Sequence, residues 1–178
     1  MPHPAPRRRQ FGASLVETTV ALAITGTLAG SLLPGWHEAR ERRQLEAASA
    51  QLATDLRLAR SLAVAQAQSV RLRVQAAQAC YVVHTGPAHG CSCDSAGQAL
   101  CSGDALPLRV AALPGQGRLA LSSSSGSMLF DAGRGTVTPT GTLRLHAADG
   151  RAIHHVVNIM GRVRTCSPGA RVAGHPAC

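Results

Sequence analysis

The stretch that decides the fold of this chain runs from Gly12 to Pro34, reads GASLVETTVALAITGTLAGSLLP and contains one charged residue, Glu17. An α-helix rises about 1.5 Å per residue, so residues 13–34 are long enough to cross a hydrocarbon core of roughly 30 Å. Three arginines, residues 7–9, come shortly before this stretch. Because arginine is enriched on the cytoplasmic side of a membrane span, we expect the rest of the chain to be exported.

A secretory signal peptide or a plain single-span anchor would share this basic and apolar pattern. The small residues that a signal peptidase needs, residues 29–31, lie inside the apolar run and not at its end. Glu17 favours another interpretation. A carboxylate in an apolar helix costs about 2.5–3.5 kcal/mol at the membrane centre, so such a residue usually has a partner.

This segment resembles the N-terminus of type IV pilins and pseudopilins, in which a short basic leader ends in Gly and the fifth residue after it is Glu. Gly12 and Glu17 match that spacing, and Pro34 falls where many pilins have a helix-kinking proline. Ala13 departs from the Phe that is usual in the family. The resemblance implies that prepilin peptidase cuts after Gly12, that the amine of Ala13 is methylated, and that Glu17 pairs with the amine of a neighbouring pilin subunit during assembly.

The rest of the chain divides into an amphipathic segment and a strand-rich domain. Residues 35–67 are expected to continue the helix, because apolar residues recur there at three- and four-residue steps. This stripe comprises Leu45, Ala48, Leu52, Leu56, Ala59 and either Leu62 or Ala63. From residue 69 the apolar period becomes two, as in half-buried strands, and Asp149-Gly150 between two β-rich runs predicts a hairpin.

These patterns predict an α+β fold of the type IV pilin kind, with a long N-terminal helix packed on antiparallel β-sheets. The expected parts are a prepilin leader at 1–12, a transmembrane and assembly helix at 13–34, the amphipathic half of the helix at 35–67, and a β-rich domain with an Arg-rich tail at 68–178.

Positive charge is concentrated in the C-terminal domain. The chain has 18 basic residues, all of them Arg, against nine acidic residues. Residues 13–67 contain five of each, whereas residues 68–178 contain ten Arg and four acidic residues, with no acid after Asp149. Such a field favours an anionic partner.

Six cysteines lie beyond the export segment: Cys80, Cys91, Cys93, Cys101, Cys166 and Cys178. An even number of exported cysteines favours disulfides in an oxidising periplasm. Proximity in the sequence favours a Cys166–Cys178 bridge and leaves two bridges among the four cysteines between 80 and 101. Zinc is the rival interpretation, because His84 and His89 lie near Cys91 and Cys93, although structural zinc sites more often separate their cysteines by two to four residues.

Two arginines near the C-terminus form the candidate binding site. Arg162 and Arg164 are two positions apart, so an extended backbone places both guanidinium groups on one side. Gly161 permits an unusual turn before them, and a Cys166–Cys178 bridge would hold Arg171 close by. Guanidinium groups bind phosphate oxygens well. A solvated basic edge strand that discourages sheet-to-sheet pairing explains the same pattern without a ligand.

A second resemblance bears on this choice. The chain from Ser127 onward looks like the GspH/FimT pilin family on these residues: Phe130, Gly133-Arg134-Gly135, Gly141-Thr142 and Gly161-Arg162-Val163-Arg164. In the FimT branch, minor pilins of type IV pili with a C-terminal Gly-Arg-x-Arg motif bind DNA during uptake for natural transformation. The resemblance implies DNA binding through Gly161, Arg162 and Arg164. The alternative is a GspH-type pseudopilin of type II secretion, or a structural minor pilin, that binds no nucleic acid.

The sequence offers no catalytic site, because no paired carboxylates, metal-ligand set or nucleophile–base pair stands out. We therefore expect neither an enzyme nor a cofactor. His154 and His155 fall on opposite faces of the expected strand at 153–160. Stacking of single-stranded bases needs aromatic side chains, and the chain has only four, so we predict non-specific capture of duplex phosphate. We expect a single-pass inner-membrane protein with a periplasmic domain that enters a pilus after assembly.

Overall fold

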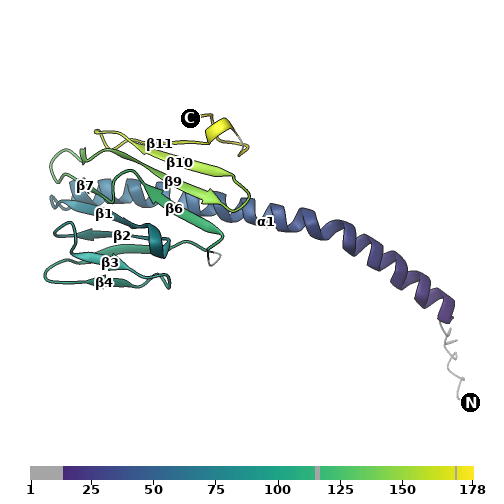
Figure 1. Cartoon of the computed structure of the whole chain (residues 1–178). Coiled ribbons are helices and arrows are strands. Elements are labelled where there is room, and N and C mark those ends of the chain that lie inside the picture. The colour runs from purple at the N-terminus through teal and green to yellow at the C-terminus, as the bar shows by residue number, and fades with distance from the viewer. Residues whose placement is uncertain (1–13, 115–116, 171) are drawn as a thin grey trace, which may run out of the picture. The chain divides into compact units, whose positions relative to one another are not determined.

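The computed structural model describes residues 14–114, 117–170 and 172–178 (Figure 1). It confirms the α+β fold, in which one long helix is followed by antiparallel strands. The chain divides between Arg40 and Glu41 into two units, and the strands that the structure describes belong to the second unit. The predicted cleavage and methylation sites, Gly12 and Ala13, lie outside the described residues.

Helix α1 spans Leu15–Ala65. In the unit that ends at Arg40, large apolar side chains such as that of Leu22 are exposed. The hydroxyl groups of Thr18 and Thr27 donate to backbone carbonyls one turn earlier, so the helix satisfies these polar groups itself. No helix in the described part of the chain is long and apolar enough to cross a membrane, so the expected span at 13–34 is not confirmed.

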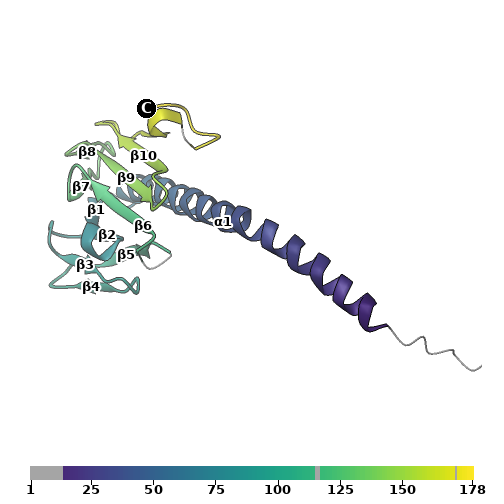
Figure 2. The ribbon, with the colours of Figure 1, turned by 45° about the vertical axis from the view of Figure 1, so that its right-hand side comes forward.

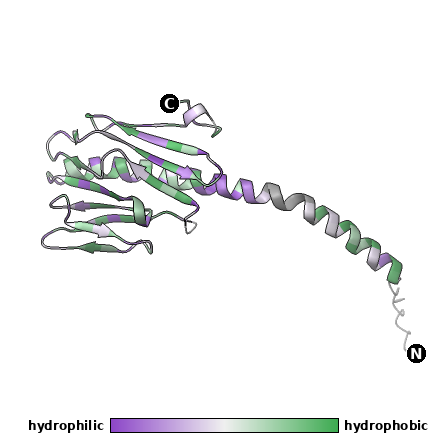
Figure 3. Ribbon diagram, in the orientation of Figure 1, coloured by the Kyte–Doolittle hydropathy of each residue, from purple (hydrophilic) through white to green (hydrophobic). Residues whose placement is uncertain are grey.

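The second part of α1, from Glu41 to Ala65, carries the predicted apolar stripe. Leu45, Leu52 and Leu56 have no exposed surface, and they share one core with the inner faces of the two larger sheets. Figure 3 shows a hydrophilic stretch of α1 before this stripe, where residues 38–43 supply five charged side chains. The amphipathic pattern therefore buries one face of the helix on the β-rich domain.

Two larger sheets and a small hairpin make up the rest of the second unit. One sheet has the strand order β5-β2-β1-β7-β8, the other has the order β11-β10-β9-β6, and β3 pairs with β4. Figure 2 shows both larger sheets on the second part of α1. The strands are β1 (Val70–Gln75), β2 (Cys80–Thr85), β3 (Cys91–Cys93), β4 (Ala99–Cys101), β5 (Pro107–Ala112), β6 (Leu119–Ser123), β7 (Ser127–Phe130), β8 (Val137–Thr138), β9 (Gly141–Ala147), β10 (Ala152–Val157) and β11 (Val163–Cys166). Short 3-10 turns occupy Ala76–Gln78 and Pro168–Ala170.

The predicted hairpin at Asp149-Gly150 is present and joins β9 to β10 in antiparallel register. Gly150 has a φ of +85°, the left-handed conformation that an Asp-Gly turn favours. The strand expected at 153–160 is shorter than predicted, because β10 ends at Val157 and the chain then turns into β11. That turn carries the candidate site.

The six cysteines form three disulfides: Cys80–Cys93, Cys91–Cys101 and Cys166–Cys178. The Cys166–Cys178 bridge agrees with the prediction, and the other two join the four clustered cysteines. Because Cys91 and Cys93 are both oxidised, they cannot supply the thiolates that the rival zinc interpretation needs. The clustered bridges instead close the β3–β4 hairpin and tie it to β2.

A buried carboxylate connects α1 to the larger sheet. Asp55 accepts a hydrogen bond of 2.7 Å from the Tyr81 hydroxyl in β2 and lies 3.4 Å from Nε of Arg109 in β5. Burial, together with the hydrogen bond to Asp55, raises the pKa of Tyr81 far above its usual value. The phenol therefore stays protonated and remains a donor to Asp55 at every ordinary pH.

Candidate nucleic-acid interface

The predicted Gly-Arg-x-Arg site begins in a tight turn between β10 and β11. The Gly161 N–H donates to the Asn158 carbonyl at 2.9 Å, and the Asn158 N–H donates to the Arg162 carbonyl at 3.1 Å. The side-chain oxygen of Asn158 accepts the Arg162 N–H at 2.9 Å. These bonds fix the turn and place Arg162 immediately before β11, with Arg164 inside that strand.

Gly161 is required at its position for two separate reasons. Its φ is +70°, a conformation that residues with a Cβ atom adopt only under strain. A Cβ atom there would also lie 2.6 Å from the Gly135 carbonyl oxygen and 2.7 Å from Cδ of Arg60. The turn therefore packs directly on α1, where Nε of Arg60 donates to the same Gly135 carbonyl at 3.2 Å.

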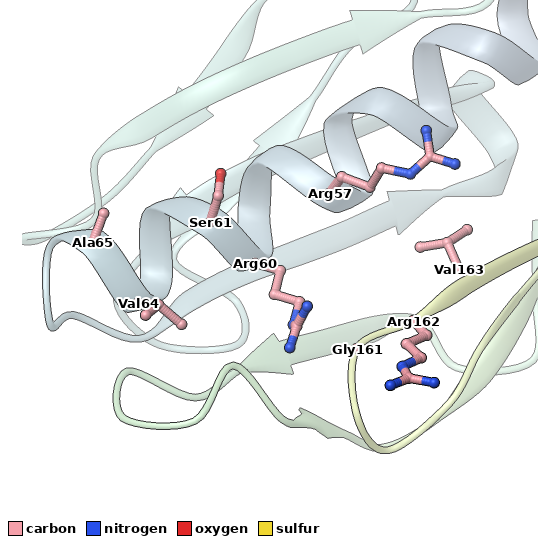
Figure 4. Close-up of a pocket in the computed structure, with 8 residues that line it drawn as sticks. All are labelled: Arg57, Arg60, Ser61, Val64, Ala65, Gly161, Arg162 and Val163. Atoms are coloured by element: carbon pink, nitrogen blue, oxygen red, sulfur yellow. The ribbon is translucent and has the colours of Figure 1, made fainter.

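An open groove of about 740 Å³ lies between α1 and this turn (Figure 4). Three arginines line it: Arg57 and Arg60 from α1, and Arg162 from the turn. Figure 4 shows the side chains of Arg60 and Arg162 extending in the same general direction, with Arg57 farther along the helix. Arg57 also lines an adjacent groove with Arg42, so arginine side chains continue along this side of α1.

None of the ion pairs in the part of the chain that the structure describes involves Arg57, Arg60, Arg162 or Arg164. The pairs are Arg42–Glu46, Arg109–Asp55 and Arg151–Asp149. The loop that supplies Gly135 contains one acid, Asp131, whose carboxylate accepts the backbone N–H groups of Gly133 and Arg134. Both bonds go to Oδ1, lower the pKa of Asp131 and hold the carboxylate within its own loop. The groove thus presents guanidinium groups to an external anion.

The structure brings together part of the predicted site. Gly161 and Arg162 line the groove, whereas Arg164 is exposed opposite Val156 of β10 and is not among the lining residues. Arg171 lies outside the described residues. Glu17, the predicted assembly residue, is exposed in the first turn of α1.

Arg57 and Arg60 belong to the groove but were not predicted as site residues. Neither has an acidic residue three or four positions away on either side, unlike Arg42, which pairs with Glu46. Two arginines three positions apart on a helix repel each other slightly when nothing neutralises them. A pair of helical arginines with no acidic neighbour is therefore the sequence feature that could have indicated this part of the site, because a bound anion would relieve the repulsion between the two guanidinium groups.

A buried histidine holds β10 and β11 against α1. Nε2 of His155 lies 3.1 Å from Oγ of Ser49, and Nδ1 lies 3.1 Å from Oγ1 of Thr165. Burial lowers the pKa of His155 to about 4, with smaller contributions from the charges of His175, Arg57 and His154. The two histidines were expected on opposite faces of the strand, and the structure buries His155 while His154 is only half-buried. The neutral imidazole thus holds β11, whose first residue Val163 lines the groove, in place against α1.

Comparison with known proteins gives one family model and solved structures of two similar proteins. A family model described as type II transport protein GspH matches residues 48–161. The minor pseudopilin EpsH from the type 2 secretion system of Vibrio cholerae is similar with a TM-score of 0.52 and 14% identity, over 71% of this chain and 98% of that chain. The type IV minor pilin FimU of Pseudomonas aeruginosa is similar with a TM-score of 0.52 and 20% identity, over 76% of this chain and 96% of that chain. Comparison with curated protein sequences finds no match.

Proposed function

Since the chain belongs to the GspH family and is thus a minor pilin or pseudopilin, we propose that it is a type IV minor pilin that binds DNA for uptake in natural transformation. Binding is non-specific and is directed at the phosphate backbone. Pilin-type proteins assemble with other pilin subunits, so the DNA site would be carried into a fibre. The family is structural, and we propose no catalytic role.

The observation that carries this proposal is the groove with three arginines and no ion-pair partner for them among the described residues. Duplex DNA carries one negative charge per about 1.7 Å of helix axis, and each guanidinium that meets a phosphate releases condensed counterions. Arg162 and Arg164 belong to the motif, Arg57 and Arg60 enlarge its field, and Arg171 would add to it. A few such contacts give weak affinity that falls steeply with salt.

We propose that the N-terminal part follows the pilin pattern. Residues 1–12 form the leader, prepilin peptidase cuts after Gly12, and the new amine on Ala13 is methylated. Residues 13–34 hold the protein in the inner membrane until assembly, when Glu17 pairs with the amine of a neighbouring subunit. Support comes from the match of Gly12 and Glu17 to the pilin spacing.

A pseudopilin of type II secretion is the second candidate function. The similarity to EpsH is as strong in TM-score as the similarity to FimU, and the family description names type II transport. In that role, or in that of a purely structural minor pilin, the C-terminal arginines would form a solvated edge that meets no nucleic acid. DNA binding by the purified chain distinguishes these functions.

The proposal predicts a specific salt dependence, measured by fluorescence anisotropy with a labelled duplex and the full chain in a nonionic detergent. Arg162→Gln/Arg164→Gln removes two charges that make no ion pair in the described residues. We expect the affinity at low salt to fall about tenfold, and the slope of log affinity against log salt to become shallower by about 1–2.

Arg40→Gln/Arg43→Gln is the matched control, because it removes two exposed arginines of α1 that do not line the groove. It should change affinity and slope much less. Absence of DNA binding by the wild-type chain at low salt, or equal slopes for the wild type and the Arg162/Arg164 variant, would reject DNA binding through the motif and favour the second candidate.

A further inference from the structure

The turn that carries Arg162 displays two large apolar side chains at its tip. Ile159 and Met160 occupy the corner positions between Asn158 and Gly161, with 60% and 52% of their surfaces exposed. Such corners usually hold Gly, Pro, Asn, Asp or Ser. Ile159 and Met160 are more than half exposed in these positions, so most of their apolar surface is available to a ligand.

The backbone of the tip is held on both of its sides. The Gly161 N–H bonds to the Asn158 carbonyl at 2.9 Å, and the Val137 N–H bonds to the Ile159 carbonyl at 2.8 Å. Gly161 itself packs on Arg60 of α1. Because the tip is already ordered, presenting its two side chains to a ligand costs little conformational entropy.

We propose that Ile159 and Met160 form an apolar wedge that inserts between base pairs of duplex DNA from the minor groove. Arg162 and Arg60, beside the tip, would hold the flanking phosphates. Proteins that bind the minor groove often insert Ile, Met, Leu or Phe at a base step and kink the duplex there. The inference rests on the proposed DNA binding and deepens it. It specifies duplex DNA and adds a contact that favours base steps that are easily kinked.

Charge favours DNA over a second copy of this chain as the occupant of the tip. The arginines beside the tip make no ion pair among the described residues. The β-rich domain of another copy carries ten arginines and four acidic residues in residues 68–178, so it would repel this surface on average. A duplex offers phosphates to the arginines and base faces to the apolar tip.

The test uses the full chain in nonionic detergent and a duplex with 2-aminopurine at a central TA step, where fluorescence rises when the base unstacks. We expect the wild type to raise the fluorescence and Ile159→Ser/Met160→Ser to abolish the rise. The affinity of this variant should fall about tenfold through lost apolar contact. Its salt slope should stay unchanged, because no charge has been removed.

Two further variants serve as controls. Leu100→Ser/Leu106→Ser removes two comparably exposed apolar side chains, at 62% and 63% exposure, and should leave DNA binding unchanged. Ile159→Val/Met160→Leu keeps the tip apolar and should retain both the affinity and the fluorescence rise.

Each other outcome has a definite meaning. Equal affinity and equal fluorescence for the wild type and the Ser variant would overturn the wedge and leave the arginine-based function standing. If the Ser variant instead loses self-association in sedimentation while its DNA binding is unchanged, the tip is a subunit contact and the wedge is wrong. A wild-type chain that binds no duplex rejects both the wedge and the proposed function.

Discussion

Gly161 makes the contact on which the position of Arg162 depends. It combines a φ of +70° with an approach to the Gly135 carbonyl and to Arg60 that leaves no room for a Cβ atom. We expect Gly161→Ala to destabilise the domain by about 2–4 kcal/mol, through backbone strain together with overpacking. Urea denaturation measures this change, and DNA affinity should fall with it because Arg162 moves away from α1.

Gly150→Ala is the matched control for that prediction. Gly150 also has a positive φ, of +85°, but a Cβ atom there would meet nothing within 4 Å. This substitution should cost only the conformational strain, about 1 kcal/mol. If Gly161→Ala is no more destabilising than Gly150→Ala, the close contact with α1 is not what fixes the turn.

At the scale of elements, His155 joins α1, β10 and β11. Its pKa is about 4 in the folded state against an ordinary value of 6.5, so the unfolded chain takes up a proton that the folded chain refuses. Stability from this group is therefore complete above about pH 6.5 and is lost as the pH falls towards 4. Between pH 7 and pH 4.5 we expect a loss of about 2–3 kcal/mol in the free energy of unfolding.

His155→Gln isolates this contribution, because other groups titrate in the same range and remain in both proteins. The variant should be less stable than the wild type at pH 7, and the difference should shrink as the pH falls to 4.5. Urea denaturation at the two pH values measures it. A difference that stays constant between them would show that protonation of His155 does not weaken the union of α1 with β10 and β11.

Local sequence pattern was sufficient for α1 and for the β9–β10 hairpin. The period of the buried leucines fixes which face of the helix meets the sheets, and Asp149-Gly150 favours its turn by backbone conformation alone. The end of β10 was not predictable in this way. An apolar run continues through Ile159 and Met160, and the turn arises because the Asn158 side chain takes the Arg162 N–H.

Only the Gly-Arg-x-Arg part of the candidate site could be predicted from the sequence. Gly161 and Arg162 are recognisable in the sequence, whereas the participation of Arg57 and Arg60 depends on which part of α1 meets the turn. That meeting is set by the packing of Gly161 and Gly135 around the Arg60 side chain, a contact between segments far apart in the sequence. The periodic pattern of apolar residues within one segment does not predict such a long-range contact.

At the scale of the whole molecule, the proposed assembly and the proposed DNA capture depend on different parts of the chain. Glu17 lies in the unit that ends at Arg40, and the groove lies in the unit that begins at Glu41. A carboxylate in an apolar helix needs a partner, so we expect Glu17→Ala to prevent incorporation into pili. The purified variant should bind duplex DNA with the affinity and salt slope of the wild type.

Immunoblots of sheared pili measure incorporation, and fluorescence anisotropy measures DNA binding by the same variant. Normal amounts of the Glu17→Ala protein in the pilus fraction would contradict the assembly role. A matched fall in DNA affinity would contradict the separation of the two tasks.

The contacts of Asp55 fix the position of α1 along the β-rich domain. Sliding the helix by one turn would pull its carboxylate away from Tyr81 and Arg109 and leave a buried charge uncompensated, at a cost of about 3–5 kcal/mol. Asp55 thus fixes the α1 wall of the groove against one sheet, and His155 joins α1 to β10 and β11 on the other side. A binding site that needs no rearrangement associates as fast as diffusion and charge steering allow, so we expect the proposed DNA binding to have a fast association rate that falls as salt is added.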